Sequence, residues 1–179
     1  MSAARAMGAA LAAWLLGSAG PATADGGEPP VHAVSLQLPS VGTSSVAAQL
    51  ERDLERHQLS LAAGLGIRTA AMGDYGSFTL GAGVELRRWF RLPMRGWFAA
   101  ARLDAGRTVL EQETEDRRIG SLWTLSSSLS IGYRWVFFDR VELTPSLGLA
   151  AVAEGGMDGR SPWTTRAAPV VGLTAGWMF

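Results

Sequence analysis

The amino-acid sequence predicts an all-β fold, a closed, antiparallel, up-and-down transmembrane β-barrel of eight strands. Three observations lead to this prediction. Apolar residues alternate with small or polar ones in successive segments, short stretches rich in Gly, Pro and charge separate the segments, and the apolar positions carry aromatic residues near segment ends. Successive side chains of a strand point to opposite faces, so the alternation predicts strands with one apolar face.

Composition and charge exclude several classes of protein. The 179 residues suit one domain; 47% of them are hydrophobic and 18% are charged, against about one quarter charged in an average soluble domain. All 16 basic residues are Arg, and 16 acidic residues balance them, which leaves no basic face for nucleic acid. The absence of Cys excludes a disulfide framework and a thiolate metal site.

The first 24 residues have the pattern of a secretory signal peptide. Arg5 supplies a positive charge, residues 6–17 form an apolar run, and Ala22 to Ala24 match a small-x-small cleavage site. The run is shorter than the roughly 20 residues that a membrane-spanning helix needs. We therefore expect residues 1–24 to be removed on export, residues 25–30 to form a short flexible N-terminus, and residues 31–179 to form the barrel.

Six segments alternate clearly, and two more do so over a shorter length. The clear segments are 58–69, 78–90, 96–109, 122–137, 140–153 and 170–179. The shorter ones are 34–38 and 44–53. In the last of these, Val46, Leu50 and Leu54 also recur every four residues, which is helical spacing. An even strand number, the rule for bacterial single-chain barrels, favours a strand there, but the sequence leaves the helix open.

The two faces of these strands differ in a way that favours a membrane over a soluble barrel or sandwich. One face is mostly Gly, Ser, Thr and Ala, which suits the inside of a narrow barrel. The other is apolar throughout and would cause aggregation in water. Its aromatic residues are Phe78, Phe90, Trp97, Trp123, Tyr133, Trp135, Phe137, Trp177 and Phe179. Arg52, Arg88 and Arg107 share this face near strand ends, where an Arg costs only about 0–1 kcal/mol.

Eight charged residues fall on the inward face. They are Glu51, Arg68, Glu85, Arg87, Arg102, Asp104, Arg134 and Glu142. Such a group could form a catalytic pocket, but buried charges need partners, so we expect a salt-bridge network that fills the lumen. Short hairpin turns place Glu85 opposite Arg102 and Arg134 opposite Glu142.

The lengths of the connections predict an orientation. If both termini are periplasmic, the short turns at 54–57, 92–95 and 138–140 lie on the periplasmic side. The longer connections at 111–120 and 155–163 then lie outside the cell. Short periplasmic turns and long external loops are typical of outer-membrane barrels.

The C-terminus carries a resemblance to a known family. Apolar residues occupy every second position before a terminal Phe, namely Val171, Leu173, Ala175, Trp177 and Phe179. This pattern resembles the sorting signal of outer-membrane proteins of Gram-negative bacteria, and the whole chain resembles small eight-stranded barrels of the OmpA/OmpX type. The resemblance implies insertion by the barrel-assembly machinery, which reads the strand ending at Phe179, and an environment of outer-membrane lipid and lipopolysaccharide.

The resemblance names no ligand, cofactor or metal, and the sequence suggests no catalytic, cofactor-binding or metal-binding residue. Lipid A deacylases of this architecture use a His and a Ser two residues apart, and neither His32 nor His57 has a Ser in that place. We therefore expect a non-enzymatic integral outer-membrane protein with a plugged lumen and a structural or surface-interaction role. The alternatives are a lipid-modifying enzyme, which would hydrolyse or transfer an acyl chain of lipid A, and a small channel.

Overall fold

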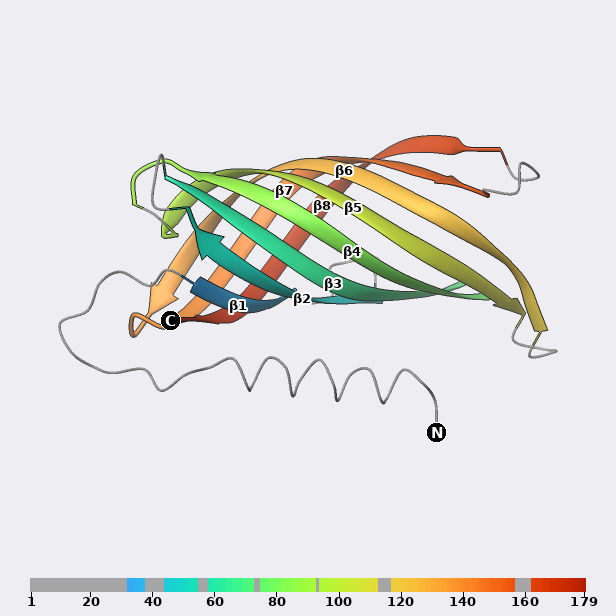
Figure 1. Ribbon diagram of the computed structural model, residues 1–179, viewed down its shortest axis with the longest axis horizontal. Coiled ribbons are helices and arrows are strands. Elements are labelled where there is room, and N and C mark those ends of the chain that lie inside the picture. Colours follow the sequence, from blue (N-terminus) through green and yellow to red (C-terminus); the bar gives the residue numbers. More distant parts are fainter. Residues whose placement is uncertain are drawn as a thin grey trace.

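The computed structural model of the protein describes residues 32–37, 44–54, 58–72, 75–92, 94–112, 117–156 and 162–179. These residues form eight antiparallel strands, each paired with the next, and β1 pairs with β8 to close a barrel whose strands run obliquely (Figure 1). The strands are β1 (His32–Gln37), β2 (Ser44–Asp53), β3 (Leu59–Met72), β4 (Tyr75–Trp89), β5 (Gly96–Gln112), β6 (Arg117–Phe137), β7 (Val141–Gly155) and β8 (Thr164–Met178). The predicted closed, eight-stranded up-and-down barrel is confirmed. The expected signal peptide and flexible N-terminus lie outside the described residues.

The segment that left a helix open is strand β2, which pairs with β1 and β3 along its length. Val46 and Leu50 are exposed, whereas Ala47, Gln49 and Glu51 between them are buried. This is the two-residue period of a strand. A helix would instead have placed Val46 and Leu50 together on a buried face, so the helical interpretation is wrong.

The strands extend further than the alternation predicts. β5 runs to Gln112 and β6 begins at Arg117, so the expected connection over 111–120 contracts to 113–116, which lies outside the described residues. The β5–β6 register shifts by a bulge between Leu110 and Glu111. Backbone hydrogen bonds hold a two-stranded ladder whatever its side chains, so the pairing continues past the last apolar residue.

The two ends of the barrel differ, and we name them for what they contain. The terminal end, on the left of Figure 1, holds the start of β1, the end of β8 and the connections β2–β3, β4–β5 and β6–β7. The loop end holds the other four connections. At the terminal end, His32 and Phe179 exchange backbone hydrogen bonds of 3.0 and 2.9 Å, so the last residue of the chain helps to close the barrel.

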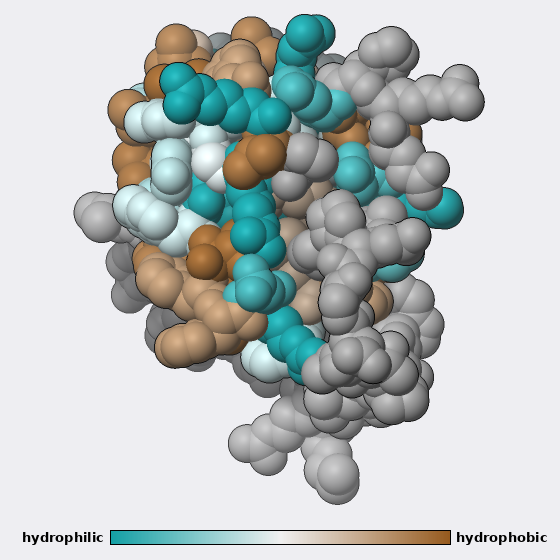
Figure 2. All heavy atoms as spheres, turned by 90° about the vertical axis from the view of Figure 1, so that its left-hand side faces the viewer, coloured by the Kyte–Doolittle hydropathy of each residue, from teal (hydrophilic) through white to brown (hydrophobic). Residues whose placement is uncertain are grey.

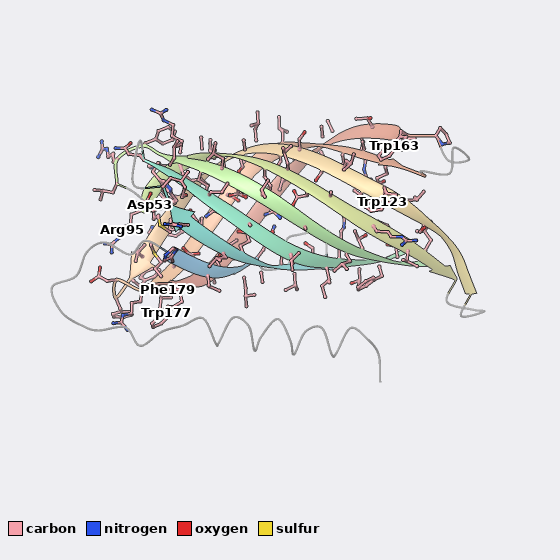
Figure 3. All side chains as sticks on the ribbon, viewed as in Figure 1. Asp53, Arg95, Trp123, Trp163, Trp177 and Phe179 are labelled. Carbon is pink, nitrogen blue, oxygen red and sulfur yellow. The ribbon has the colours of Figure 1, made fainter. Side chains whose placement is uncertain are left out.

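Side chains alternate between lumen and exterior as predicted. Leu103, Leu129 and Leu149 expose 62%, 70% and 69% of their surface, and their sequence neighbours point into the lumen. Exposed apolar side chains ring the barrel in this way, and they include Leu36, Val46, Leu61, Leu80, Leu147 and Val171. Figure 3 places Trp123 and Trp163 towards the loop end and Trp177 and Phe179 at the terminal end.

Candidate functional site

The lumen is closed at the terminal end by a cluster of buried apolar side chains. Trp89 and Phe98 face each other across β4 and β5, with ring centroids 5.0 Å apart. Met94 and Met178 belong to the same cluster, with Ala33 and Ala100, and each of the four large side chains exposes at most 1% of its surface. In Figure 2, which views this end, hydrophilic side chains run through the middle with hydrophobic ones beside them.

A glycine makes room for this cluster. Gly132 of β6 lies opposite Phe98 in the ladder. A Cβ at Gly132 would come within 2.4 Å of Cζ of the Phe98 ring and 2.8 Å of the Pro145 carbonyl oxygen. The ring therefore occupies the space of a Cβ at position 132, which only Gly leaves free.

Glu51 is the centre of the charged network next to this cluster. Its carboxylate receives hydrogen bonds from Arg87 Nη1 at 2.8 Å, from Arg134 Nη2 and from Ser60 Oγ. All four side chains are buried. They come from β2, β3, β4 and β6, so Glu51 joins strands that are not all neighbours in the wall.

Arg87 and Arg134 also contact aromatic residues of the apolar cluster. The Arg87 guanidinium lies 5.1 Å from the Phe98 ring centroid, and that of Arg134 lies 4.8 Å from the Trp89 ring. Trp89 Nε1 donates to Ser60 Oγ at 2.9 Å. Each cation therefore contacts both a carboxylate and an aromatic ring, and both kinds of contact stabilise a buried positive charge.

The predicted register of the β4–β5 hairpin is confirmed. Glu85 lies directly opposite Arg102, and Arg102 Nη1 is 3.6 Å from Glu85 Oε2. Each also has a closer partner. Arg102 Nη2 is 2.7 Å from Asp104 Oδ1, and Glu85 accepts a hydrogen bond from Arg87 Nε. The hairpin pair is thus one link in a longer chain of charges.

The prediction that Arg134 lies opposite Glu142 is wrong. Glu142 pairs with Val136, and the hydroxyl of Thr144 lies 3.3 Å from Arg134 Nε. Phe138 and Asp139 both have positive φ, 52° and 59°, and the turn is centred one residue later than expected. Arg134 Nε still reaches Glu142 Oε2 at 2.9 Å along a diagonal, so the ion pair forms in spite of the changed register.

Ser60 and Trp89 are members of the site that the sequence analysis left out. Both lie on inward positions of their strands, and both bond to the network through polar atoms. The alternation alone could have included them. The sequence analysis also expects Arg68 in the salt-bridge network. In the structure its side chain is exposed and lines the cavity.

The lumen towards the loop end contains a cavity of about 590 Å³. It begins at Arg87, Arg102 and Phe98, and glycines and hydroxyl side chains make up much of the rest of its wall. They include Gly64, Gly81, Gly83, Gly106, Thr79, Thr124, Ser126, Ser128, Ser130 and Ser146. The expectation of a filled lumen therefore applies to the terminal end only.

His32 lies on β1 with its ring 5.8 Å from that of Phe179, and His57 lies outside the described residues. Within the described ranges, no three His, Cys, Asp or Glu side chains are grouped so that they could hold a metal ion. In the same ranges, no helix is long and apolar enough to cross a membrane. The chain matches no protein-family model and no curated protein sequence.

Proposed function

We propose that the protein is a non-enzymatic integral outer-membrane β-barrel with a structural or surface-interaction role in the cell envelope. One observation carries this proposal: all eight strands of a closed barrel expose large apolar side chains, while half of the buried residues are charged or polar and most of the buried apolar ones are alanines. A protein in water would have the opposite arrangement, because a continuous apolar surface of this extent drives association. A hydrocarbon solvent favours it, because a closed barrel leaves no unpaired strand edge.

The charged and aromatic residues of the outer surface support the same proposal. Arg52 and Arg88 are exposed on the outer face near strand ends, and Arg107 is exposed opposite Trp123; from these places an arginine can reach the lipid head groups. Trp97, Trp135 and Phe137 are exposed towards the terminal end and Trp123 towards the loop end. Aromatic residues at both borders of an apolar band are typical of outer-membrane barrels.

The orientation and the export route belong to the proposal. The terminal end faces the periplasm, residues 1–24 direct export, and the strand ending at Phe179 is read by the barrel-assembly machinery. The surrounding molecules are phospholipid and lipopolysaccharide.

Fractionation and gel mobility test the proposal. The protein should separate with the outer membrane, and it should migrate faster on unboiled gels than after boiling, because a closed barrel resists unfolding by detergent. Deletion of Phe179 should leave the chain in the periplasm, where it is degraded. A water-soluble wild-type protein with the same mobility before and after boiling would contradict the proposal.

The two alternatives have their own measurements. A channel is disfavoured because Trp89, Phe98, Met94 and Met178 close the terminal end, so the purified protein should give no large, stable conductance in planar bilayers. An enzyme acting on lipid A would change its acyl pattern. Lipid A from cells that overproduce the protein should keep its acyl pattern. A lost or added acyl chain would favour the enzyme and make His32 the first residue to test.

A further inference from the structure

A groove of about 740 Å³ lies on the outer surface at the terminal end. It runs between the β4–β5 connection and β6. The side chains that matter for the inference are Arg91, Arg95, Trp97, Tyr133 and Trp135, with Ile131 towards the middle of the barrel. It therefore combines a cationic border with an aromatic and apolar wall.

The aromatic wall is formed by three rings in contact. The Trp97 and Tyr133 centroids are 5.2 Å apart with the rings at 80°, and those of Tyr133 and Trp135 are 5.3 Å apart at 54°. These are edge-to-face and tilted geometries that stabilise aromatic pairs. Trp97 and Trp135 nevertheless keep 59% and 45% of their surface exposed, so the wall is ordered and free to meet a ligand.

Gly96 lines the groove between Arg95 and Trp97. Its φ is +82°, and a Cβ built on it would meet no atom within 4 Å. The left-handed conformation favours glycine.

Three charged side chains lie at the border, Arg91, Arg95 and Asp139, and their net charge is +1. Arg91 is exposed, and its carbonyl oxygen accepts a 3.1 Å hydrogen bond from Gln58 Nε2. Arg95 Nη2 lies 3.0 Å from Asp139 Oδ1, with 37% and 84% of the two side chains exposed. Asp139 thus compensates one arginine and leaves the second without a carboxylate in the groove.

We propose that this groove binds a phosphatidylglycerol from the leaflet around the terminal end. Arg91 and Arg95 donate to the phosphodiester oxygens, since guanidinium groups match the geometry of phosphate. The glycerol and acyl chains lie along Trp97 and Ile131, where the groove continues into the apolar band. The single excess positive charge favours a head group of charge −1 over the zwitterionic head group of phosphatidylethanolamine. This inference rests on the proposed membrane location.

The test measures lipid retained by the purified full-length barrel. The protein is extracted from vesicles of equal parts phosphatidylglycerol and phosphatidylethanolamine, and native mass spectrometry counts the lipids that remain bound. We expect the wild type to retain phosphatidylglycerol about tenfold more than phosphatidylethanolamine. The double variant Arg91→Gln/Arg95→Gln should lose this preference.

Two further variants make the test specific. Arg52→Gln/Arg88→Gln removes the same charge from exposed outer positions of β2 and β4, outside the groove, and should keep the preference. Asp139→Asn removes the compensating carboxylate and should strengthen the preference; Asn tolerates the positive φ of that residue. Equal retention of the two lipids by the wild type, or equal loss in both double variants, would overturn the inference.

Insertion is measured separately in each variant by the mobility of unboiled samples and by flotation with vesicles. A wild type that fails to insert would contradict the proposed function itself. A wild type that inserts but shows no preference for phosphatidylglycerol would contradict the lipid site alone.

Discussion

The two parts of the lumen are formed by the same strands but differ in how closely their inward side chains pack. Towards the terminal end, the inward positions carry Glu51, Arg87, Arg134, Trp89 and Phe98, all buried. Towards the loop end, glycines and hydroxyl side chains of the same strands line much of a cavity of about 590 Å³, which extends back to Arg87 and Phe98. One sheet therefore supports a tightly packed region and a hollow one, and the side chains rather than the backbone pairing distinguish them.

This difference predicts where the barrel is sensitive to substitution. Buried charges are costly unless each is paired, and removal of one partner leaves the other without compensation. Exposed pairs contribute little, because water already solvates their charges. We therefore expect similar substitutions to have large effects near the terminal end and small effects near the loop end.

The largest effect should come from Glu51→Gln. This change removes the carboxylate shared by Arg87 and Arg134 and should lower the free energy of unfolding by about 3–5 kcal/mol. The control is Glu154→Gln near the loop end, where Glu154 Oε1 lies 3.3 Å from Arg166 Nη2 and the pair is solvent-exposed; its loss should be below about 1 kcal/mol. Urea titration of both variants in lipid vesicles checks the contrast, and equal losses would show that the two ends do not differ.

The second largest effect should come from Glu85 and Arg102, which link the charged network around Glu51 to the cavity. Glu85→Ala and Arg102→Ala should each cost about 2–3 kcal/mol, because each removes charge-assisted hydrogen bonds. The double variant should recover part of the summed loss, by about 1 kcal/mol, since the two side chains contact each other. Arg87 and Asp104 remain as partners for the two charges, which keeps the coupling small. Strictly additive losses would show that the 3.6 Å contact contributes nothing.

The strand faces could be predicted from the sequence because they depend on local alternation alone. Leu103, Leu129 and Leu149 are exposed as their positions in the pattern require. The Glu85–Arg102 pairing could also be predicted, because a two-residue turn determines the register of a hairpin.

Other features could not be predicted, because they depend on geometry that the pattern does not contain. Phe138 and Asp139 both have positive φ where the β6–β7 register shifts, and Phe138 is not of a residue type that predicts this conformation. The central place of Glu51 arises from contacts across the lumen between β2, β4 and β6. Contacts between strands that are not neighbours cannot be predicted from the pairing of neighbouring strands.

The third effect tests the close packing of the apolar cluster. Gly132→Ala should cost about 2 kcal/mol, because its Cβ would overlap the Phe98 ring and the Pro145 carbonyl. Gly120→Ala, on the same strand towards the loop end, meets no atom within 4 Å and should change stability by less than about 0.5 kcal/mol. The same unfolding titration compares them. If Gly120→Ala were as damaging as Gly132→Ala, backbone conformation rather than packing would explain both.

The smallest effect gives the sharpest comparison, because the same Ser→Ala substitution is made once in the packed region and once at the cavity. Ser60 Oγ donates to Glu51 and accepts from Trp89 Nε1, so Ser60→Ala leaves a buried indole N–H and a buried carboxylate each short of one partner. That loss should be about 1–2 kcal/mol. Ser128 faces the cavity, where water can replace its hydroxyl, so Ser128→Ala should cost less than about 0.5 kcal/mol. Trp89 fluorescence should also shift in Ser60→Ala alone, because only there does the indole lose its acceptor. A shift of equal size in Ser128→Ala would mean that the network extends into the cavity and that the two regions are one.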